Sequence, residues 1–127
     1  MRFSAVLVSV VSAAAAALAQ SSGTGDATFY AAGLGACGIF NTDADFIVAV
    51  SSQVFDTFPG AGANPNANPI CNRQLTATGP DGKSVTLTVT DRCAGCAPGD
   101  IDLTPTAFQQ LADLAVGRLH GVTWTIA

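Results

Sequence analysis

The sequence predicts a small, mostly β domain, either a barrel or a sandwich, with a single short helix. Several short runs of β-forming residues alternate with segments rich in glycine, proline and asparagine. The last run, residues 122–126, alternates apolar and polar side chains as a half-buried strand does. Only residues 107–115 place apolar side chains at helical spacing. Many short strands with one helix are typical of small β architectures.

The N-terminal segment has the pattern of a secretory signal peptide. Arg2 supplies a positive charge, an apolar run covers residues 6–18, and residues 17–19 (Ala-Leu-Ala) form a small-x-small cleavage pattern. The apolar run falls short of the roughly 20 residues that a transmembrane helix needs. We therefore expect residues 1–19 to be removed, which leaves one secreted, soluble domain over residues 20–127.

The first half of that domain is predicted to hold two strands and a helical turn. Residues 21–25 read as a flexible lead-in because they are Ser, Gly and Thr. Residues 26–30 and 46–50 are runs of β-formers and predict strands, the second of them buried. Ser52 is expected to cap a helical turn that ends before a proline. Residues 60–69 are rich in Gly, Asn and Pro and predict a loop.

A β-hairpin is predicted over residues 74–90. Residues 74–78 and 84–90 both alternate polar and apolar side chains, and Gly-Pro-Asp-Gly at 79–82 is a strong turn pattern. The alternation directs Val85, Leu87 and Val89 toward the core and the threonines outward.

A helix is predicted to follow. Thr104 and Pro105 have the residue types preferred at the N-cap and at the first helical position. The apolar residues at 107–115 continue the helical spacing, and Gly117 is a suitable stop.

Charge and histidine content exclude several functions. The chain carries nine acidic residues, all of them aspartates, against five Lys and Arg, a net charge of −4. Without a basic stripe, neither nucleic acid nor an anionic membrane surface is expected as a partner. His120 is the sole histidine, so no Ser-His-Asp constellation, no His-rich metal site and no cofactor are predicted. Neutral polysaccharides fit better as partners.

Four cysteines remain after the predicted cleavage: Cys37, Cys71, Cys93 and Cys96. An even number in a secreted chain favours disulfides, with three connectivities open. A Cys₄ zinc site usually has two Cys-x-x-Cys pairs, and only one is present here. That pair runs into Ala-Pro-Gly, which is unlike the helix start of a thioredoxin-type redox site.

Two aspartates stand in positions where they can carry chemistry. Asp91 ends the hairpin's second strand, and Asp102 lies between apolar Ile101 and Leu103, so its side chain points away from theirs. Paired carboxylates are what glycoside hydrolysis uses. Alternatively, Asp91 accepts turn hydrogen bonds and Asp102 helps to cap the following helix.

Five stretches in order along the chain resemble one known family, the rare lipoprotein A-like double-psi β-barrels, which includes expansin domains and fungal loosenin-like proteins. The stretches are Gly25–Tyr30 (GDATFY), Gly35–Gly38 (GACG), Asn68–Cys71 (NPIC), Val89–Cys96 (VTDRCAGC) and Gly99–Phe108 (GDIDLTPTAF). The final strand with Trp124 also matches. The resemblance covers nearly the whole of residues 20–127.

The resemblance implies a six-stranded double-psi β-barrel with one or two short helices and an open polysaccharide groove. Carried over by motif, the groove residues are Thr28, Asp91 and Asp102. Tyr30 adds an aromatic edge for sugar stacking or, alternatively, packs in the core. Barwin-like relatives pair the cysteines that correspond to Cys37–Cys71, which leaves Cys93–Cys96.

This sequence also departs from the family. Cys93 stands two residues after the Thr-Asp acid, where bacterial expansin-like domains often have an aromatic residue, and Asp100-Ile101-Asp102 replaces the plant His-Phe-Asp motif. The second, cellulose-binding expansin domain has no counterpart in the sequence.

Three functions follow as hypotheses. The first is a monomeric, non-hydrolytic protein that binds or loosens cell-wall polysaccharide: glucan, chitin or cellulose. The second is a lytic transglycosylase or endoglucanase that uses Asp91 or Asp102. The third is a protein-binding module, such as a cysteine-protease inhibitor or an effector, with residues 60–69 as a candidate contact.

Overall fold

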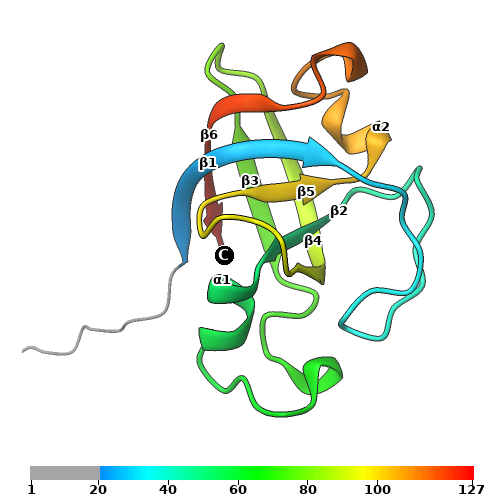
Figure 1. Cartoon of the computed structure of the whole chain (residues 1–127), viewed down its shortest axis with the longest axis vertical. Coiled ribbons are helices and arrows are strands. Elements are labelled where there is room, and N and C mark those ends of the chain that lie inside the picture. The colour runs from blue at the N-terminus through cyan, green and yellow to red at the C-terminus, as the bar shows by residue number, and fades with distance from the viewer. Residues whose placement is uncertain (1–20) are drawn as a thin grey trace, which may run out of the picture.

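The computed structural model describes residues 21–127, so the predicted signal peptide lies outside the described residues. Six strands close into a barrel in the order β1–β5–β2–β4–β3–β6, as predicted (Figure 1). The strands are β1 (Ser22–Phe29), β2 (Ile47–Ser51), β3 (Gln74–Thr78), β4 (Ser84–Cys93), β5 (Ile101–Leu103) and β6 (Leu119–Ile126). Two short α-helices, α1 (Ser52–Thr57) and α2 (Pro105–Phe108), and two 3₁₀ turns, Pro65–Ala67 and Leu114–Val116, complete it.

Two of the strand pairings are parallel, β1 with β5 and β2 with β4, and the others are antiparallel. Parallel neighbours need long connections, and the segment before β5 has to cross close to β1. Gly25 and Gly99 meet at this crossing, where the position of a Cβ on Gly99 would overlap the Thr24 carbonyl. Small residues at 25 and 99 therefore let the two chain segments touch.

The core follows the alternation predicted from the sequence. Val85, Leu87 and Val89 point inward, as does Trp124, which is 2% exposed. The Trp124 Nε1–H donates to the Gly99 carbonyl at 2.9 Å, so the largest core side chain also fixes the crossing segment. Burying a side chain of this size contributes a few kcal/mol, roughly 25 cal/mol per Å² of apolar area.

The prediction of a flexible lead-in at residues 21–25 is wrong. Ser22 to Gly25 pair with the end of β6 and extend β1 backward. Their residue types favour no strand, but β6 presents backbone donors and acceptors that only a neighbouring strand can satisfy. Tertiary pairing therefore overrides local propensity.

The helical turn after β2 forms as predicted, but its cap is Ser51 and not Ser52. The Ser51 hydroxyl accepts the Val54 N–H at 3.3 Å and donates to the Pro98 carbonyl at 2.9 Å. Ser51 is fully buried at the end of β2, whereas the Ser52 hydroxyl contacts only its neighbour Gln53. The sequence pattern could not separate two adjacent serines.

The helix predicted over residues 105–115 is much shorter. α2 ends at Phe108, and the chain then turns through Leu111 and Ala112 before Asp113 takes an extended conformation with ψ 147°. The apolar residues at helical spacing still pack against the core, through turns in place of a continuous helix. Gly117, predicted to end this helix, instead ends the separate 3₁₀ turn Leu114–Val116, with φ +71°.

Both predicted disulfides are confirmed. Cys37–Cys71 joins the loop after β1 to the segment after the 60–69 loop, and Cys93–Cys96 closes a tight loop at the end of β4. Disulfides of this kind persist in oxidising compartments. Among residues 21–127, no helix is long and apolar enough to cross a membrane.

Candidate functional site

Three of the residues predicted for the groove lie in one row across four strands. Thr28 on β1 pairs with Asp102 on β5, Asp102 pairs with Ala49 on β2, and Ala49 pairs with Asp91 on β4. Directly opposed residues of neighbouring strands point to the same side of the sheet. The neighbours of Thr28 and Asp102 along their strands, Ala27, Ile101 and Leu103, are buried in the core, so the row faces outward.

A bulge in β4 brings Asp91 into this row. Val85, Leu87 and Val89 point inward, so strict alternation would also turn Asp91 into the barrel. The register between β2 and β4 shifts after Val89, and Thr90 becomes the extra residue. Asp91 thereby reaches the outer surface. The sequence alone shows no signal for this bulge.

Asp91 is held by three hydrogen bonds. Its Oδ1 accepts from the backbone N–H groups of Ala36 at 2.9 Å and Arg92 at 2.8 Å, and its Oδ2 accepts from the Tyr30 hydroxyl at 3.1 Å. Gly35 lies flat against the same carboxylate, where a Cβ would come within 3.3 Å of the Asp91 side chain. The loop after β1 therefore fixes the orientation of Asp91.

Asp102 has a different environment. Its Oδ1 accepts the Thr28 hydroxyl at 2.9 Å, which is its one side-chain hydrogen bond among the described residues. Burial raises the pKa of Asp102 above its ordinary value, the Thr28 hydrogen bond lowers that pKa, and the nearby Asp91 charge raises it. Asp102 thus carries a proton more readily than an ordinary aspartate does.

Tyr30 contacts Asp91 and lies close enough to both acids to be affected by their charges. Burial raises the pKa of its hydroxyl, as do the negative charges of Asp91 and Asp102. The hydroxyl therefore stays protonated and donates to Asp91. The sequence left open whether Tyr30 stacks on a sugar or packs in the core. In the structure its side chain is half-buried, and its hydroxyl lies in the row of acids.

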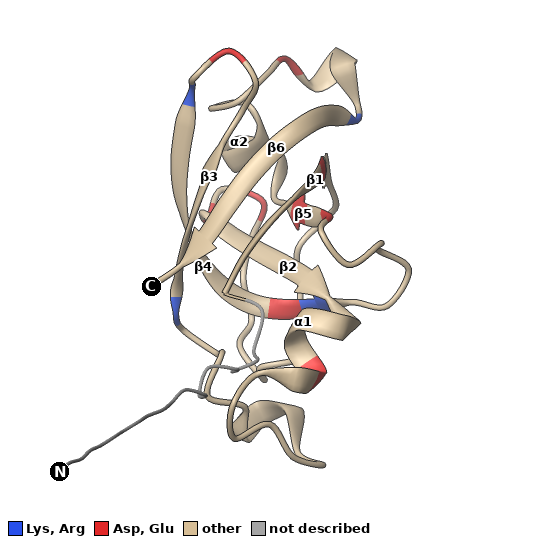
Figure 2. Cartoon of the chain, turned by 90° about the vertical axis from the view of Figure 1, so that its left-hand side faces the viewer, with Lys and Arg blue, Asp and Glu red and all other residues tan. Residues whose placement is uncertain are grey.

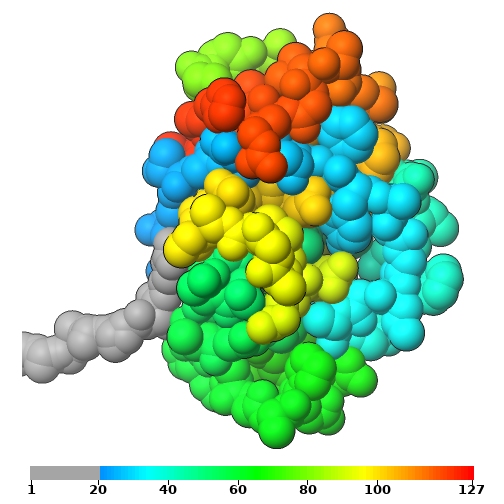
Figure 3. Space-filling model, in the orientation of Figure 1, coloured from blue at the N-terminus to red at the C-terminus, as the bar shows by residue number. Residues whose placement is uncertain are grey.

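A hollow of about 360 Å³ lies next to Asp91. Its lining includes Ala36 and Arg92, which both contact Asp91, together with Phe55, Asp56, Gly62, Ala63, Pro65 and Asn68. Arg92 forms a two-point ion pair with Asp56, at 2.9 and 2.7 Å. The loops after β1, after α1 and after β4 meet on this face, coloured cyan, green and yellow in Figure 3. Sequence reasoning did not single out Arg92, Asp56 or this hollow.

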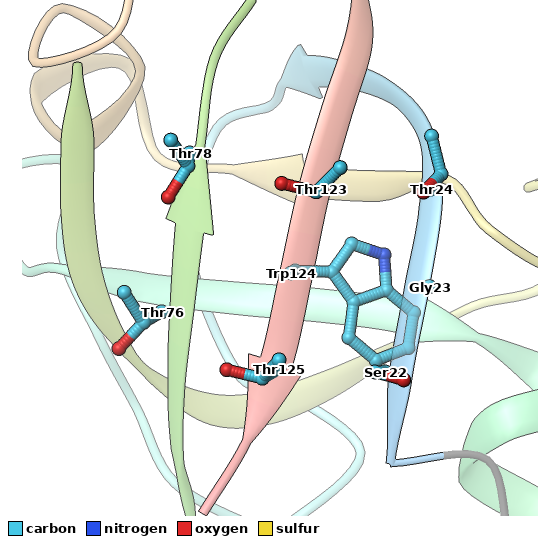
Figure 4. A pocket seen from close by; sticks show the side chains of 8 residues that line it. All are labelled: Ser22, Gly23, Thr24, Thr76, Thr78, Thr123, Trp124 and Thr125. Carbon is cyan, nitrogen blue, oxygen red and sulfur yellow. The ribbon is translucent and has the colours of Figure 1, made fainter. Parts of the chain in front are cut away.

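The other half of the barrel presents a face of hydroxyls without charge. Two rows cross β1, β6, β3 and β4 (Figure 4), namely Ser22–Thr125–Thr76–Thr86 and Thr24–Thr123–Thr78–Ser84. They border a shallow hollow of about 330 Å³. β3 and β6 contain no Asp, Glu, Lys or Arg, and the charged positions coloured in Figure 2 adjoin only the ends of these strands. Outward threonines are ordinary on strands, and this face lies apart from the row of acids.

The remaining titratable side chains do not extend the row of acids. His120 is exposed on β6 and pairs with Asp26 at 2.8 Å, away from Asp91. Across residues 21–127, no three His, Cys, Asp or Glu side chains converge as a metal site requires. The chemistry of the row is therefore that of hydroxyls, one hydrogen-bonded carboxylate and one carboxyl with a raised pKa.

Comparison with known families identifies the fold. The profile of a double-psi β-barrel family described as lytic transglycolase matches residues 22–123. The chain belongs to this family. Its sequence is 37% identical over 115 residues to an Asp f 7 allergen homologue of Arthroderma benhamiae, which covers 80% of this chain and 38% of that protein. It is 33% identical over 103 residues to the papain inhibitor of Streptomyces mobaraensis, which covers 80% of this chain and 68% of the inhibitor.

Two solved structures of the family are similar in shape. The Streptomyces papain inhibitor has a TM-score of 0.73 and 30% identity, over 84% of this chain and 94% of the inhibitor. A variant of the Clavibacter michiganensis expansin in complex with cellohexaose has a TM-score of 0.64 and 30% identity, over 84% of this chain and 50% of the expansin. At equal identity, the chain is more similar in shape to the papain inhibitor than to the expansin, and it covers more of the inhibitor's length.

Proposed function

We propose that the chain is an extracellular, non-hydrolytic protein that binds cell-wall polysaccharide along the row of acids. The mature protein is residues 20–127, a monomer, and its ligand is a neutral glucan, chitin or cellulose chain. The observation that carries the proposal is the outward row Thr28–Asp102–Asp91, with Tyr30 joined to Asp91. The solved complex of a related expansin with cellohexaose supports it.

The row has the chemistry that a sugar chain needs. Carboxylate oxygens accept hydrogen bonds from sugar hydroxyls, and the Thr28 and Tyr30 hydroxyls give the row further polar groups. Many such hydrogen bonds together can hold a neutral sugar chain, which offers no charge for an ion pair. The Cys93–Cys96 disulfide and the hydrogen bond from Ala36 to Asp91 keep the row rigid. A rigid row lowers the entropy cost of binding.

The same row lacks features of a hydrolase. Cleavage by two acids requires a proton donor and a second group that acts as nucleophile or base. Asp102 has the raised pKa of a proton donor, but Asp91 already accepts three hydrogen bonds and its orientation is fixed by them. We therefore favour binding over cleavage, although the family description names a lytic activity.

The test measures binding and cleavage on one panel. Wild type, Asp91→Asn and Asp102→Asn are incubated with chitin, cellulose and insoluble β-glucan, and retained protein and released reducing ends are both measured. Thr76→Ala on the hydroxyl face is the matched control. We expect retention of wild type and Thr76→Ala, weaker retention of both Asp variants, and no reducing ends. Retention on none of the polymers contradicts the proposal. Release of reducing ends by wild type that is lost in Asp102→Asn replaces it with a hydrolytic function.

Inhibition of a papain-like cysteine protease is a second candidate function. The favouring observation is the papain inhibitor, which this chain matches over 94% of the inhibitor's solved chain. Titration of papain with the protein, read by hydrolysis of a fluorogenic peptide, tests it. Papain activity that does not fall at micromolar protein excludes this function.

A further inference from the structure

The loop between β1 and β2 contains a small hairpin, residues 33–41, that exposes two large apolar side chains. Leu34 is 70% exposed and Phe40 is 76% exposed, the highest values among the large apolar residues of the described chain. The two residues face each other across an antiparallel β-bridge, so they form one pair. Exposing both costs free energy in water, and a pair of this kind marks a contact surface more often than isolated apolar residues do.

Three backbone hydrogen bonds hold the hairpin in one conformation. Gly35 N–H donates to Ile39 at 3.0 Å, Gly38 N–H donates to Gly35 at 2.9 Å, and Asn41 N–H donates to Gly33 at 3.0 Å. The turn needs a glycine at 38, where φ is +78°. The hairpin over residues 33–41 is thus preformed.

The turn of this hairpin is anchored to the barrel, and the returning segment is held by side-chain hydrogen bonds. Cys37 is linked to Cys71, and its N–H donates to the Thr90 carbonyl at 3.1 Å. On the returning side, Asp45 accepts the Thr42 N–H at 2.9 Å and the Asn41 amide at 3.1 Å. Because the hairpin is already ordered, it loses little conformational entropy when a partner binds it.

A second exposed loop, residues 62–67, lies beside the hairpin. Gly38 lies against the Asn66 side chain, with a would-be Cβ at 2.9 Å, and Cys37–Cys71 ties the two loops together. Residues 62–67 are all exposed. In Figure 1 the loop after β1 projects beyond the barrel, and the loop after α1 lies below it. The pair Leu34 and Phe40 therefore has a polar, exposed flank, as the apolar centre of a protein interface usually has.

We propose that Leu34 and Phe40 form the central contact with the active-site cleft of a papain-like cysteine protease, with residues 62–67 at the rim. This inference rests on the second candidate function, since the papain inhibitor relative names the class of partner. A preformed hairpin with an exposed apolar pair offers a rigid contact surface. Protease–inhibitor interfaces bury about 800 Å² on each partner, so the contact has to extend past two side chains to the flanking residues 62–67. Leu34 offers no hydrogen bond to a sugar chain, so the pair fits a protein better than a polysaccharide.

The experiment compares Leu34→Ser/Phe40→Ser with wild type. The matched control is Val116→Ser, which replaces a 50% exposed apolar residue in the 3₁₀ turn Leu114–Val116. Inhibition of papain, retention on polysaccharide and thermal unfolding are measured for each. We expect the double variant to raise the inhibition constant by about tenfold or more, as loss of central contacts does. Its unfolding temperature and polysaccharide retention should equal those of wild type, and Val116→Ser should inhibit as wild type does.

The outcomes separate this inference from the functions above. If wild type does not inhibit papain, the second candidate function and the contact surface both fail. If wild type inhibits and the double variant inhibits equally well, the surface is wrong while the inhibitory function stands. If the double variant loses polysaccharide retention but still inhibits, Leu34 and Phe40 belong to the polysaccharide groove, and the inference is overturned.

Discussion

Asp91 and Asp102 share one neighbour, Ala49, which pairs with Asp102 on β5 and with Asp91 on β4. One strand therefore separates the two acids, and their Cα atoms lie about 10 Å apart at the usual strand spacing. At this separation a carboxyl group of one acid does not contact that of the other, yet each senses the other's charge. Their different hydrogen bonds then give the two acids different properties.

The first prediction concerns the pH dependence of stability. The pKa of Asp102 is raised above 3.8 in the folded protein, so the folded state binds its proton more tightly than the unfolded state does. This contribution to stability is present below pH 3.8 and is lost as pH rises through the raised pKa. Asp102→Asn, whose amide oxygen can still accept the Thr28 hydroxyl, should unfold at a higher temperature than wild type at pH 7. The advantage should vanish near pH 3.

Asp113→Asn is the control for this prediction, because Asp113 is exposed and its side chain caps no helix. Thermal unfolding of the three proteins between pH 3 and pH 7 gives the comparison. An Asp102→Asn variant that is less stable than wild type at pH 7 would show that the charge of Asp102 stabilises the fold, contrary to the argument.

Alternation along β3, β4 and β6 is strong, so a mostly β domain could be predicted from the sequence. That it closes as a six-stranded barrel could be predicted only from the family resemblance. The bulge at Thr90 could not, since it depends on how β2 aligns with β4 and not on any residue of β4 alone. Alternation without the bulge points Asp91 inward, so its place in the row came only from the family resemblance. The contacts of Ala36 and Tyr30 with Asp91 also join residues distant in sequence, which no local pattern reveals.

The second prediction tests the crossing of the segment before β5 over β1. A Cβ at Gly99 would overlap the Thr24 carbonyl. Thr24 is fixed by its pairing with Thr123, and the Gly99 carbonyl accepts the Trp124 Nε1–H. Gly99→Ala should therefore lower the free energy of unfolding by about 3 kcal/mol, the upper end for overpacking. Gly95→Ala in the preceding loop is the control: its Cβ meets nothing within 4 Å, so stability should change by about 0.5 kcal/mol or less. Urea unfolding measures both, and equal effects would contradict the assigned crossing.

The third prediction separates two adjacent serines. Ser51→Ala removes the cap of α1 and the hydrogen bond to Pro98, both at a fully buried position, and should cost about 2 kcal/mol. Ser52→Ala should change the free energy of unfolding by about 0.5 kcal/mol or less, because the Ser52 hydroxyl contacts only Gln53. A larger loss in Ser52→Ala than in Ser51→Ala would restore the cap expected from the sequence.

The last prediction contrasts the two disulfides. Cys37–Cys71 closes a separation of 34 residues and Cys93–Cys96 one of three. In the chain-entropy model the first contributes about 4 kcal/mol and the second about 1.6 kcal/mol to the free energy of unfolding. Replacing Cys37 and Cys71 with alanine should therefore lower stability more than replacing Cys93 and Cys96. Urea unfolding of the two double variants measures the difference.

The short disulfide should matter more for binding than for folding. It begins two residues after Asp91, and Ser51 on β2 pairs with Cys93 while its hydroxyl binds Pro98 just beyond the bridge. Without the bridge, the loop that borders Asp91 gains conformational freedom, and a polysaccharide must order it again on binding. The Cys93→Ala/Cys96→Ala variant should thus stay folded at 25 °C and be retained more weakly on polysaccharide. If it is retained as well as wild type, the loop does not shape the binding row.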